Sequence, residues 1–189
     1  QAALALNPNY ARAIYRTGRV YQTQGATQEP IYMKYYHDAI AKDPAYAPVY
    51  ATLFQYFYET NVTKSAEYLD KLLANSDDDP KACSYKASMK YAQGLFMEAV
   101  NQANACIAAE GNNPYINLFK IKAFAYNRLK DSVNAKSSFE EYFKRQSPDK
   151  IDGGDYSAYA ALLLKFPGNE ERVGELVNKA VAMDSVETN

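Results

Sequence analysis

The sequence offers a single histidine as a candidate for acid–base catalysis. His37 is the only histidine of the chain, and its neighbours are Tyr35, Tyr36 and Asp38. A catalytic histidine works with a nucleophile or a positioned acid within hydrogen-bond reach, and the spacing around His37 supplies no such partner. The sequence therefore predicts no catalytic residue and a protein that is not an enzyme.

Residues that could bind a metal ion are equally sparse. Structural zinc takes four Cys or His ligands, and the chain has one His and two cysteines, Cys83 and Cys106. The acidic run Asp77 to Asp79 lacks the alternating oxygen ligands, the glycine and the distant glutamate of a calcium loop. Asp79 is better suited to cap a helix that begins near Pro80. We expect no metal site and no cofactor.

The composition excludes several classes of partner. The chain of 189 residues has 21 Lys and Arg against 22 Asp and Glu, so its net charge of -1 offers no overall field for nucleic acid. No apolar run approaches the roughly 20 residues that cross a bilayer, so we expect no membrane insertion by this segment. Eighteen tyrosines and no tryptophan favour half-buried packing between elements.

A regular spacing of prolines shows which elements must position the remaining side chains. Five of the eight prolines, at 8, 44, 80, 114 and 148, are spaced at intervals of 36, 36, 34 and 34 residues. Proline favours helix boundaries, and each interval holds two helical segments around a turn, with Asn61 expected as a left-handed turn residue. Helical periodicity is clearest in the second segments, Ser65–Leu73, Met97–Ile107, Val133–Phe143 and Arg172–Met183.

The two cysteines fall on the two expected helices of one such pair. They are 23 residues apart, and their thiols could approach each other across the pair. Small buried cysteines at packing positions are nevertheless the commoner case, so we expect two separate thiols, with a disulfide as the alternative.

Helix pairs of about 34 residues cannot bury their apolar faces alone and must stack, so an all-α solenoid is expected. The pattern resembles the tetratricopeptide repeat (TPR). The first interval matches it with Ile14, Thr17-Gly18, Tyr21, Tyr36, Ala39 and Pro44, and the fourth with Phe119, Ala123, Tyr126, Ala135 and Phe139. The resemblance implies a right-handed superhelical solenoid of about five antiparallel pairs: the end of a truncated repeat at 1–9, repeats at 10–45, 46–79, 80–113 and 114–149, and a fifth repeat or capping pair at 150–187.

In the TPR family the first helices of the pairs line a concave groove that binds a peptide or a partner helix. Carried onto this chain, the resemblance implies the groove residues Arg12, Tyr15, Arg16, Arg19, Gln55, Tyr58, Lys81, Tyr85, Ser88, Tyr91, Lys120, Phe124, Asn127 and Arg128. Arg12, Arg16 and Arg19 share one helical face, where guanidinium groups could hold carboxylates. We therefore expect an acidic or carboxylate-ended peptide, with a solvated face or a docking site for an upstream helix as alternatives.

The predicted function is a non-enzymatic scaffold that binds a peptide or protein segment in this groove. The alternative is a structural spacer or a self-association module that uses exposed repeat ends. Tyrosine-rich, tryptophan-free repeats that end in Asn-Pro or Asp-Pro favour a bacterial protein, in the cytoplasm or the periplasm.

Overall fold

The computed structural model describes residues 10–76 and 81–187, and within them it contains helices and no strand. Contacts divide the chain into two compact units, Gln1–Asp79 and Pro80–Asn189. The prediction of an all-α fold is confirmed. No helix in the described ranges is both long enough and apolar enough to cross a membrane.

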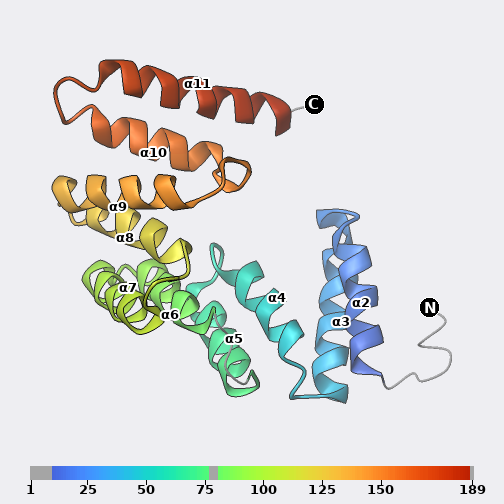
Figure 1. Ribbon diagram of the computed structural model, residues 1–189. Coiled ribbons are helices and arrows are strands. Elements are labelled where there is room, and N and C mark those ends of the chain that lie inside the picture. The colour runs from blue at the N-terminus through green and yellow to red at the C-terminus, as the bar shows by residue number, and fades with distance from the viewer. Residues whose placement is uncertain (1–9, 77–80, 188–189) are drawn as a thin grey trace. The chain divides into compact units, whose positions relative to one another are not determined.

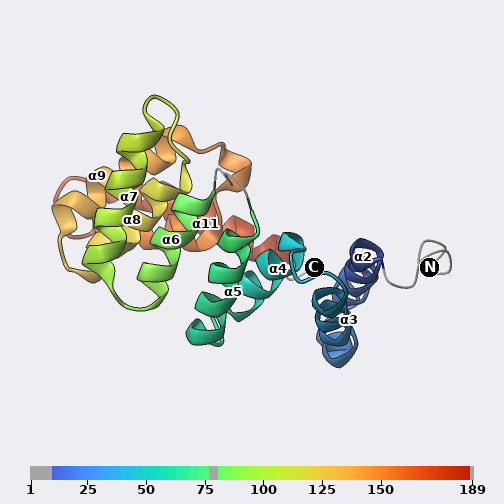
Figure 2. The ribbon, with the colours of Figure 1, turned by 90° about the horizontal axis from the view of Figure 1, so that it is seen from below.

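Within residues 10–76, unit 1 contains four α-helices in two pairs, and Figures 1 and 2 both show α2 and α3 side by side. The partner of α2 in packing is α3, the partner of α4 is α5, and α3 also touches α4. The elements are α2 (Ala11–Gln22), the short 3-10 helix η1 (Ala26–Gln28), α3 (Glu29–Lys42), α4 (Ala47–Phe57) and α5 (Val62–Ala74).

The core of unit 1 is built largely from tyrosines. Tyr36 is fully buried, and its ring lies 5.8 Å from the ring of Tyr15 and 5.8 Å from that of Tyr32. Gly18 lets α2 approach α3 closely, because a β-carbon there would lie 2.8 Å from Tyr36 Cε1. Tyr32 on α3 is buried, and its ring packs between the pairs, 6.2 Å from the ring of Tyr56.

Over residues 81–187, unit 2 contains six α-helices in three pairs that share a continuous core. Ile107 and Tyr126 pack against both of its buried clusters and so connect them. The elements are α6 (Ala82–Ala92), α7 (Phe96–Glu110), α8 (Asn117–Arg128), α9 (Ser132–Arg145), the 3-10 helix η2 (Pro148–Lys150), α10 (Gly153–Leu163) and α11 (Glu170–Glu187).

All four second-helix segments expected from periodicity are helical, within α5, α7, α9 and α11. Glycines at the turns adopt the left-handed conformation, for example Gly94 with φ 77°. The expectation for Asn61 is wrong: its φ is -153°, and its side chain accepts a 3.0 Å hydrogen bond from the backbone N–H of Lys64 as an N-cap. Asn61 therefore serves as the N-cap of α5, a position that takes an extended backbone conformation and not a left-handed one.

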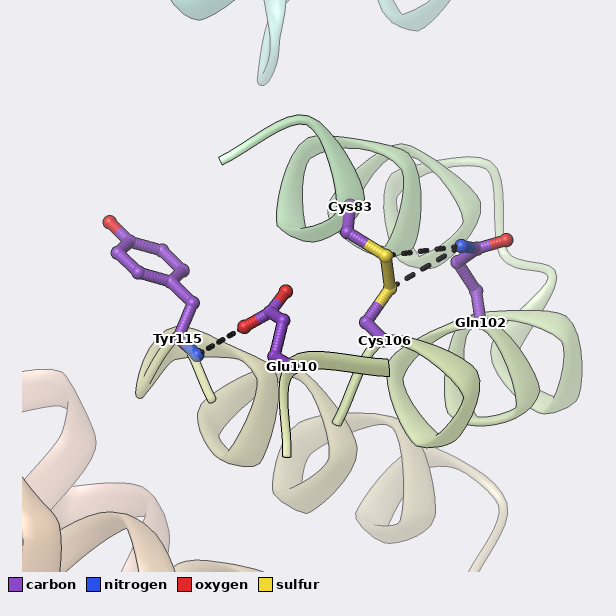
Figure 3. Close-up of a disulfide and its surroundings, with 5 residues drawn as sticks. All are labelled: Cys83, Gln102, Cys106, Glu110 and Tyr115. Carbon is purple, nitrogen blue, oxygen red and sulfur yellow. Dashed lines mark hydrogen bonds between the residues drawn. A yellow bond between two sulfur atoms is a disulfide. The ribbon is translucent and has the colours of Figure 1, made fainter. Parts of the chain in front are cut away.

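The expectation of two separate thiols is also wrong, because Cys83 and Cys106 form a disulfide. Figure 3 shows it joining α6 to α7. The antiparallel pairing places the start of α6 beside the C-terminal half of α7, and the two Cα atoms are 5.8 Å apart. The predictions for residues 1–9 and for the Asp79 cap lie outside the described residues.

Candidate functional site

The exposed side of α2 carries three arginines at successive turns. Arg12, Arg16 and Arg19 are all exposed to solvent, and α2 contains no acidic residue. Their four- and three-residue spacing places them on one side of the helix, as predicted from the sequence. Together with the aromatic and hydroxyl side chains beneath them they form a surface that we call the arginine face, made of Arg12, Tyr15, Arg16, Arg19, Tyr46 and Thr52.

Hydrogen bonds within the arginine face connect α2 to α4, the first helices of the two pairs of unit 1. The hydroxyl groups of Tyr15 on α2 and Thr52 on α4 are 2.8 Å apart. Arg19 donates from Nη1 to both of them, at 3.3 Å to Tyr15 Oη and at 3.4 Å to Thr52 Oγ1. The guanidinium of Arg19 is therefore held beside α4 and keeps other N–H groups for a ligand.

Aromatic rings form the floor of the arginine face. The rings of Tyr15 and Tyr46 meet edge to face at 5.6 Å. Burial raises the pKa of Tyr46, while the positive charges of Arg12 and Arg16 oppose that rise because they lie close to its hydroxyl. The floor is thus an apolar surface with positively charged groups at its rim. This combination suits an acidic segment with apolar side chains.

The three arginines have no carboxylate within ion-pair distance among the side chains of residues 10–76 and 81–183. Other arginines do have such partners: Arg145 lies 2.9 Å from Glu141, and Arg172 lies 3.0 Å from Glu175. The positive charge of the arginine face is therefore uncompensated by the described part of the chain.

Two further predicted groove residues lie on or beside α4. Gln55 is exposed one turn after Thr52, so it extends the arginine face along the helix. Tyr58 is half-buried, with its ring 5.9 Å from that of Phe54.

In unit 2 several predicted groove residues pack within the fold. The ring of Tyr91 lies 5.4 Å from that of Phe96, and the ring of Phe124 lies 5.3 Å from that of Phe139. The remaining members differ in exposure: Lys81 and Arg128 are exposed, while Tyr85, Ser88 and Asn127 are half-buried. Their role in binding stays a prediction.

Lys120, another predicted groove residue, lies in a partly buried ion-pair network. Its ammonium is 2.6 Å from Asp155 Oδ1 and 2.9 Å from Asp152 Oδ2. Tyr142 donates a 2.7 Å hydrogen bond to the second oxygen of Asp155, which is 1% exposed. Burial lowers the pKa of Lys120, but the hydrogen bonds to both carboxylates outweigh it, so the pKa rises overall. The ammonium is thus engaged in joining α8 to α10.

Comparison with known proteins adds the fold family to this geometry. The structure superimposes on PilW, a type IV pilus biogenesis factor, with a TM-score of 0.71 and 20% identity over 93% of this chain and 78% of that one. A tetratricopeptide repeat protein from Parabacteroides merdae matches with a TM-score of 0.68 and 15% identity, over 95% of this chain and 74% of that one. The chain has the tetratricopeptide repeat fold.

A third TPR-fold match is the crystal structure of the APC/C hetero-tetramer Cut9–Hcn1, with a TM-score of 0.66 and 17% identity. It covers 95% of this chain and 38% of the matched chain. No protein-family model and no curated protein matches the sequence. The three superpositions have identities of 20% or less, so they establish the fold and leave the site to be argued from this chain's own residues.

Two other features of this TPR fold bear on possible sites. No group of three or more His, Cys, Asp or Glu residues in the described ranges could hold a metal ion, and His37 lies exposed on α3. The loop between α7 and α8 borders a hollow of about 510 Å³, beside which Glu110 accepts a 2.6 Å hydrogen bond from the backbone N–H of Tyr115. Figure 3 shows this contact at the C-terminal end of α7, the helix that also carries Cys106.

Sequence inspection missed Tyr46 and Thr52 as parts of the arginine face, and Asp152 and Asp155 as partners of Lys120. Thr52 is 33 residues from Arg19, so only the stacking of the pairs brings them together. A sequence signal existed for Asp152: an aspartate just before a helix is a common N-cap, and its Oδ1 accepts a 2.8 Å hydrogen bond from the backbone N–H of Asp155.

Proposed function

We propose that this protein is a non-enzymatic interaction scaffold, and that its arginine face binds an acidic segment of a partner protein. The carrying observation is the row of Arg12, Arg16 and Arg19 beside a tyrosine floor, without a carboxylate partner in the described part of the chain. A guanidinium group forms paired hydrogen bonds with a carboxylate, and these are among the stronger polar contacts in proteins.

The fold supports a role in binding proteins. Cut9, which has a similar fold, was crystallised in a hetero-tetramer with Hcn1, and PilW is described as a pilus biogenesis factor. Stacked helix pairs present extended surfaces on which several side chains can contact one segment. We infer the same general use of the fold here, and the acidic character of the partner rests on this chain's arginines.

The preorganisation of Arg19 strengthens the proposal. Ordering a long side chain on binding costs about 0.5–1.5 kcal/mol, and the hydrogen bonds of Arg19 to Tyr15 and Thr52 meet part of that cost before a ligand arrives. Tyr15 and Tyr46 add rigid contact area with few rotatable bonds. The arginine face therefore combines fixed charge with apolar surface.

Fluorescence anisotropy with a short labelled glutamate-rich peptide tests the proposal. Wild-type protein should bind this peptide and should not bind the same peptide with every Glu replaced by Gln. Arg16→Gln should weaken binding roughly tenfold, because a contact worth about 1.5 kcal/mol is lost. Arg172→Gln is the matched control, because Arg172 is an exposed arginine on α11 that is already paired with Glu175.

Equal binding of the acidic and neutral peptides, or an equal effect of Arg16→Gln and Arg172→Gln, would overturn the acidic-ligand proposal. Size-exclusion chromatography of the same variants separates it from self-association. If Arg16→Glu changes the oligomer size while peptide binding is absent in wild type, the arginine face serves contacts between copies and the scaffold proposal fails.

A further inference from the structure

The only two cysteines of the chain meet in a disulfide at one end of a short helix. Cys83 is the second residue of α6, and Cys106 lies in the C-terminal half of α7. The two cysteines are 23 positions apart in the sequence, and the disulfide connects the first turn of α6 to α7. Figure 3 shows the disulfide between the two helices, with the Gln102 side chain beside it.

Few large apolar side chains hold α6 to the core. Its buried residues are Ser84, Ala87 and Met89, of which only Met89 is large. By contrast, the buried residues of α8 include Leu118, Phe119 and Ile121. Buried apolar area is the main source of helix attachment in a solenoid, so α6 gains less from packing than α8 does.

The N-cap position of α6 is occupied by a lysine. Lys81 stands at the N-cap position without a side-chain capping hydrogen bond, and the first turn has no acidic residue. The other end of α6 is better held, because Lys90 lies 2.8 Å from Glu98 and Tyr91 packs on Phe96. The covalent link is therefore placed at the opposite end of α6 from these two contacts.

We infer that the Cys83–Cys106 disulfide is a conditional clamp, which holds the start of α6 on α7 in an oxidising environment and releases it selectively on reduction. Closing the clamp removes two protons and two electrons from the thiols, and an oxidised disulfide donor accepts them as it becomes a dithiol. A dithiol reductant reverses the exchange and leaves Cys83 and Cys106 as thiols.

The two sulfurs of the clamp differ in their access to solvent. Cys106 is 1% exposed, whereas Cys83 is half-buried, so a reductant reaches the link from the side of Cys83. Gln102 Nε2 lies 3.4 Å from Cys106 Sγ and 3.7 Å from Cys83 Sγ and donates to both. Thiol-rich compartments keep most cysteines reduced, so the closed form is expected in an oxidising compartment.

Hydrogen–deuterium exchange of the full chain, before and after treatment with dithiothreitol, tests the clamp. We expect backbone exchange in Ala82–Ala92 to rise about tenfold or more on reduction, while exchange in α2 to α5 and in α10 to α11 stays unchanged. The double variant Cys83→Ala/Cys106→Ala should show the raised exchange without reductant and no further response to it, which controls for effects of the reductant itself.

Three results would overturn the clamp. The first is two free thiols, counted by alkylation and mass measurement, after equilibration with oxidised glutathione. The second is exchange in α6 that does not respond to reduction of the wild-type chain. The third is reduction that opens α6 to α11 together, since the release would then not be selective.

Discussion

Tyr15 and Thr52 place their hydroxyl groups 2.8 Å apart, and this contact joins the first helices of two successive pairs. Both side chains belong to the arginine face, and Thr52 is 6% exposed. The contact sets the spacing between α2 and α4 at the point where Arg19 crosses from one helix to the other. A packing contact inside unit 1 therefore also positions a charge on its surface.

The Tyr15–Thr52 contact should be measurable as a coupling energy. We expect the cycle of Tyr15→Phe, Thr52→Val and the double variant to give about 1 kcal/mol of coupling in the free energy of unfolding. Urea unfolding followed by circular dichroism measures it. Tyr115→Phe is the control, because that ring is 38% exposed on a loop of unit 2. A coupling near zero would show that the two hydroxyl groups contribute independently.

Gly18 should be the least replaceable glycine of unit 1. A β-carbon there would lie 2.8 Å from Tyr36 Cε1 and 2.9 Å from Tyr35 Cβ, so Gly18→Ala must push α3 away from α2. We expect a loss of about 1–3 kcal/mol in urea unfolding. Gly174→Ala, in α11 with nothing within 4 Å, should instead be neutral or stabilising by up to about 1 kcal/mol. Similar effects of the two substitutions would contradict the close packing.

Removal of the Lys120 ammonium should destabilise unit 2, because Asp155 is 1% exposed and would lose its cation. We expect Lys120→Met to cost about 1–3 kcal/mol in the free energy of unfolding. Lys34→Met is the matched control, because Lys34 forms an exposed pair with Asp38 on α3. Its removal should change the free energy of unfolding little. Equal losses would show that Asp155 is stable without a counter-charge.

Stability should fall as the solution becomes alkaline. Burial raises the pKa of Tyr36 from 10.0 to about 12, so between these values the unfolded chain releases a proton that the folded chain keeps. The raised pKa of Lys120 acts in the same direction. The urea concentration at the midpoint of unfolding should therefore be lower at about pH 11 than at about pH 8. In Tyr36→Phe the difference between the two midpoints should be smaller. Tyr115→Phe should keep the wild-type slope, and a slope unchanged by Tyr36→Phe would contradict this explanation.

The fold was predictable because proline spacing and helical periodicity act locally and agree with each other. Segments such as Val133–Phe143 are helical as expected, since their apolar residues recur every three or four positions. Asn61 was misjudged because the same residue type serves left-handed turns and N-caps, and only the backbone conformation distinguishes them.

The candidate site was less predictable, since it depends on contacts between pairs. The one-sided row of Arg12, Arg16 and Arg19 follows from helix geometry alone. Arg19 hydrogen-bonds to Thr52, 33 positions away, and Lys120 forms an ion pair with Asp155, 35 positions away. Both contacts exist only because the helix pairs stack. The disulfide was not predicted, because the spacing of two cysteines along two helices does not fix whether their side chains face each other.

Nuclear magnetic resonance mapping tests the central claim most directly. A glutamate-rich peptide is titrated into the isotope-labelled full chain, and the backbone amide shifts are followed along the sequence. If the arginine face is the binding surface, the largest shifts fall in Ala11–Gln22 and around Tyr46 to Gln55, and Arg16→Gln needs about ten times more peptide to reach the same shifts. Shifts confined to unit 2, or a titration of the α2 shifts that Arg16→Gln leaves unchanged, would contradict the claim.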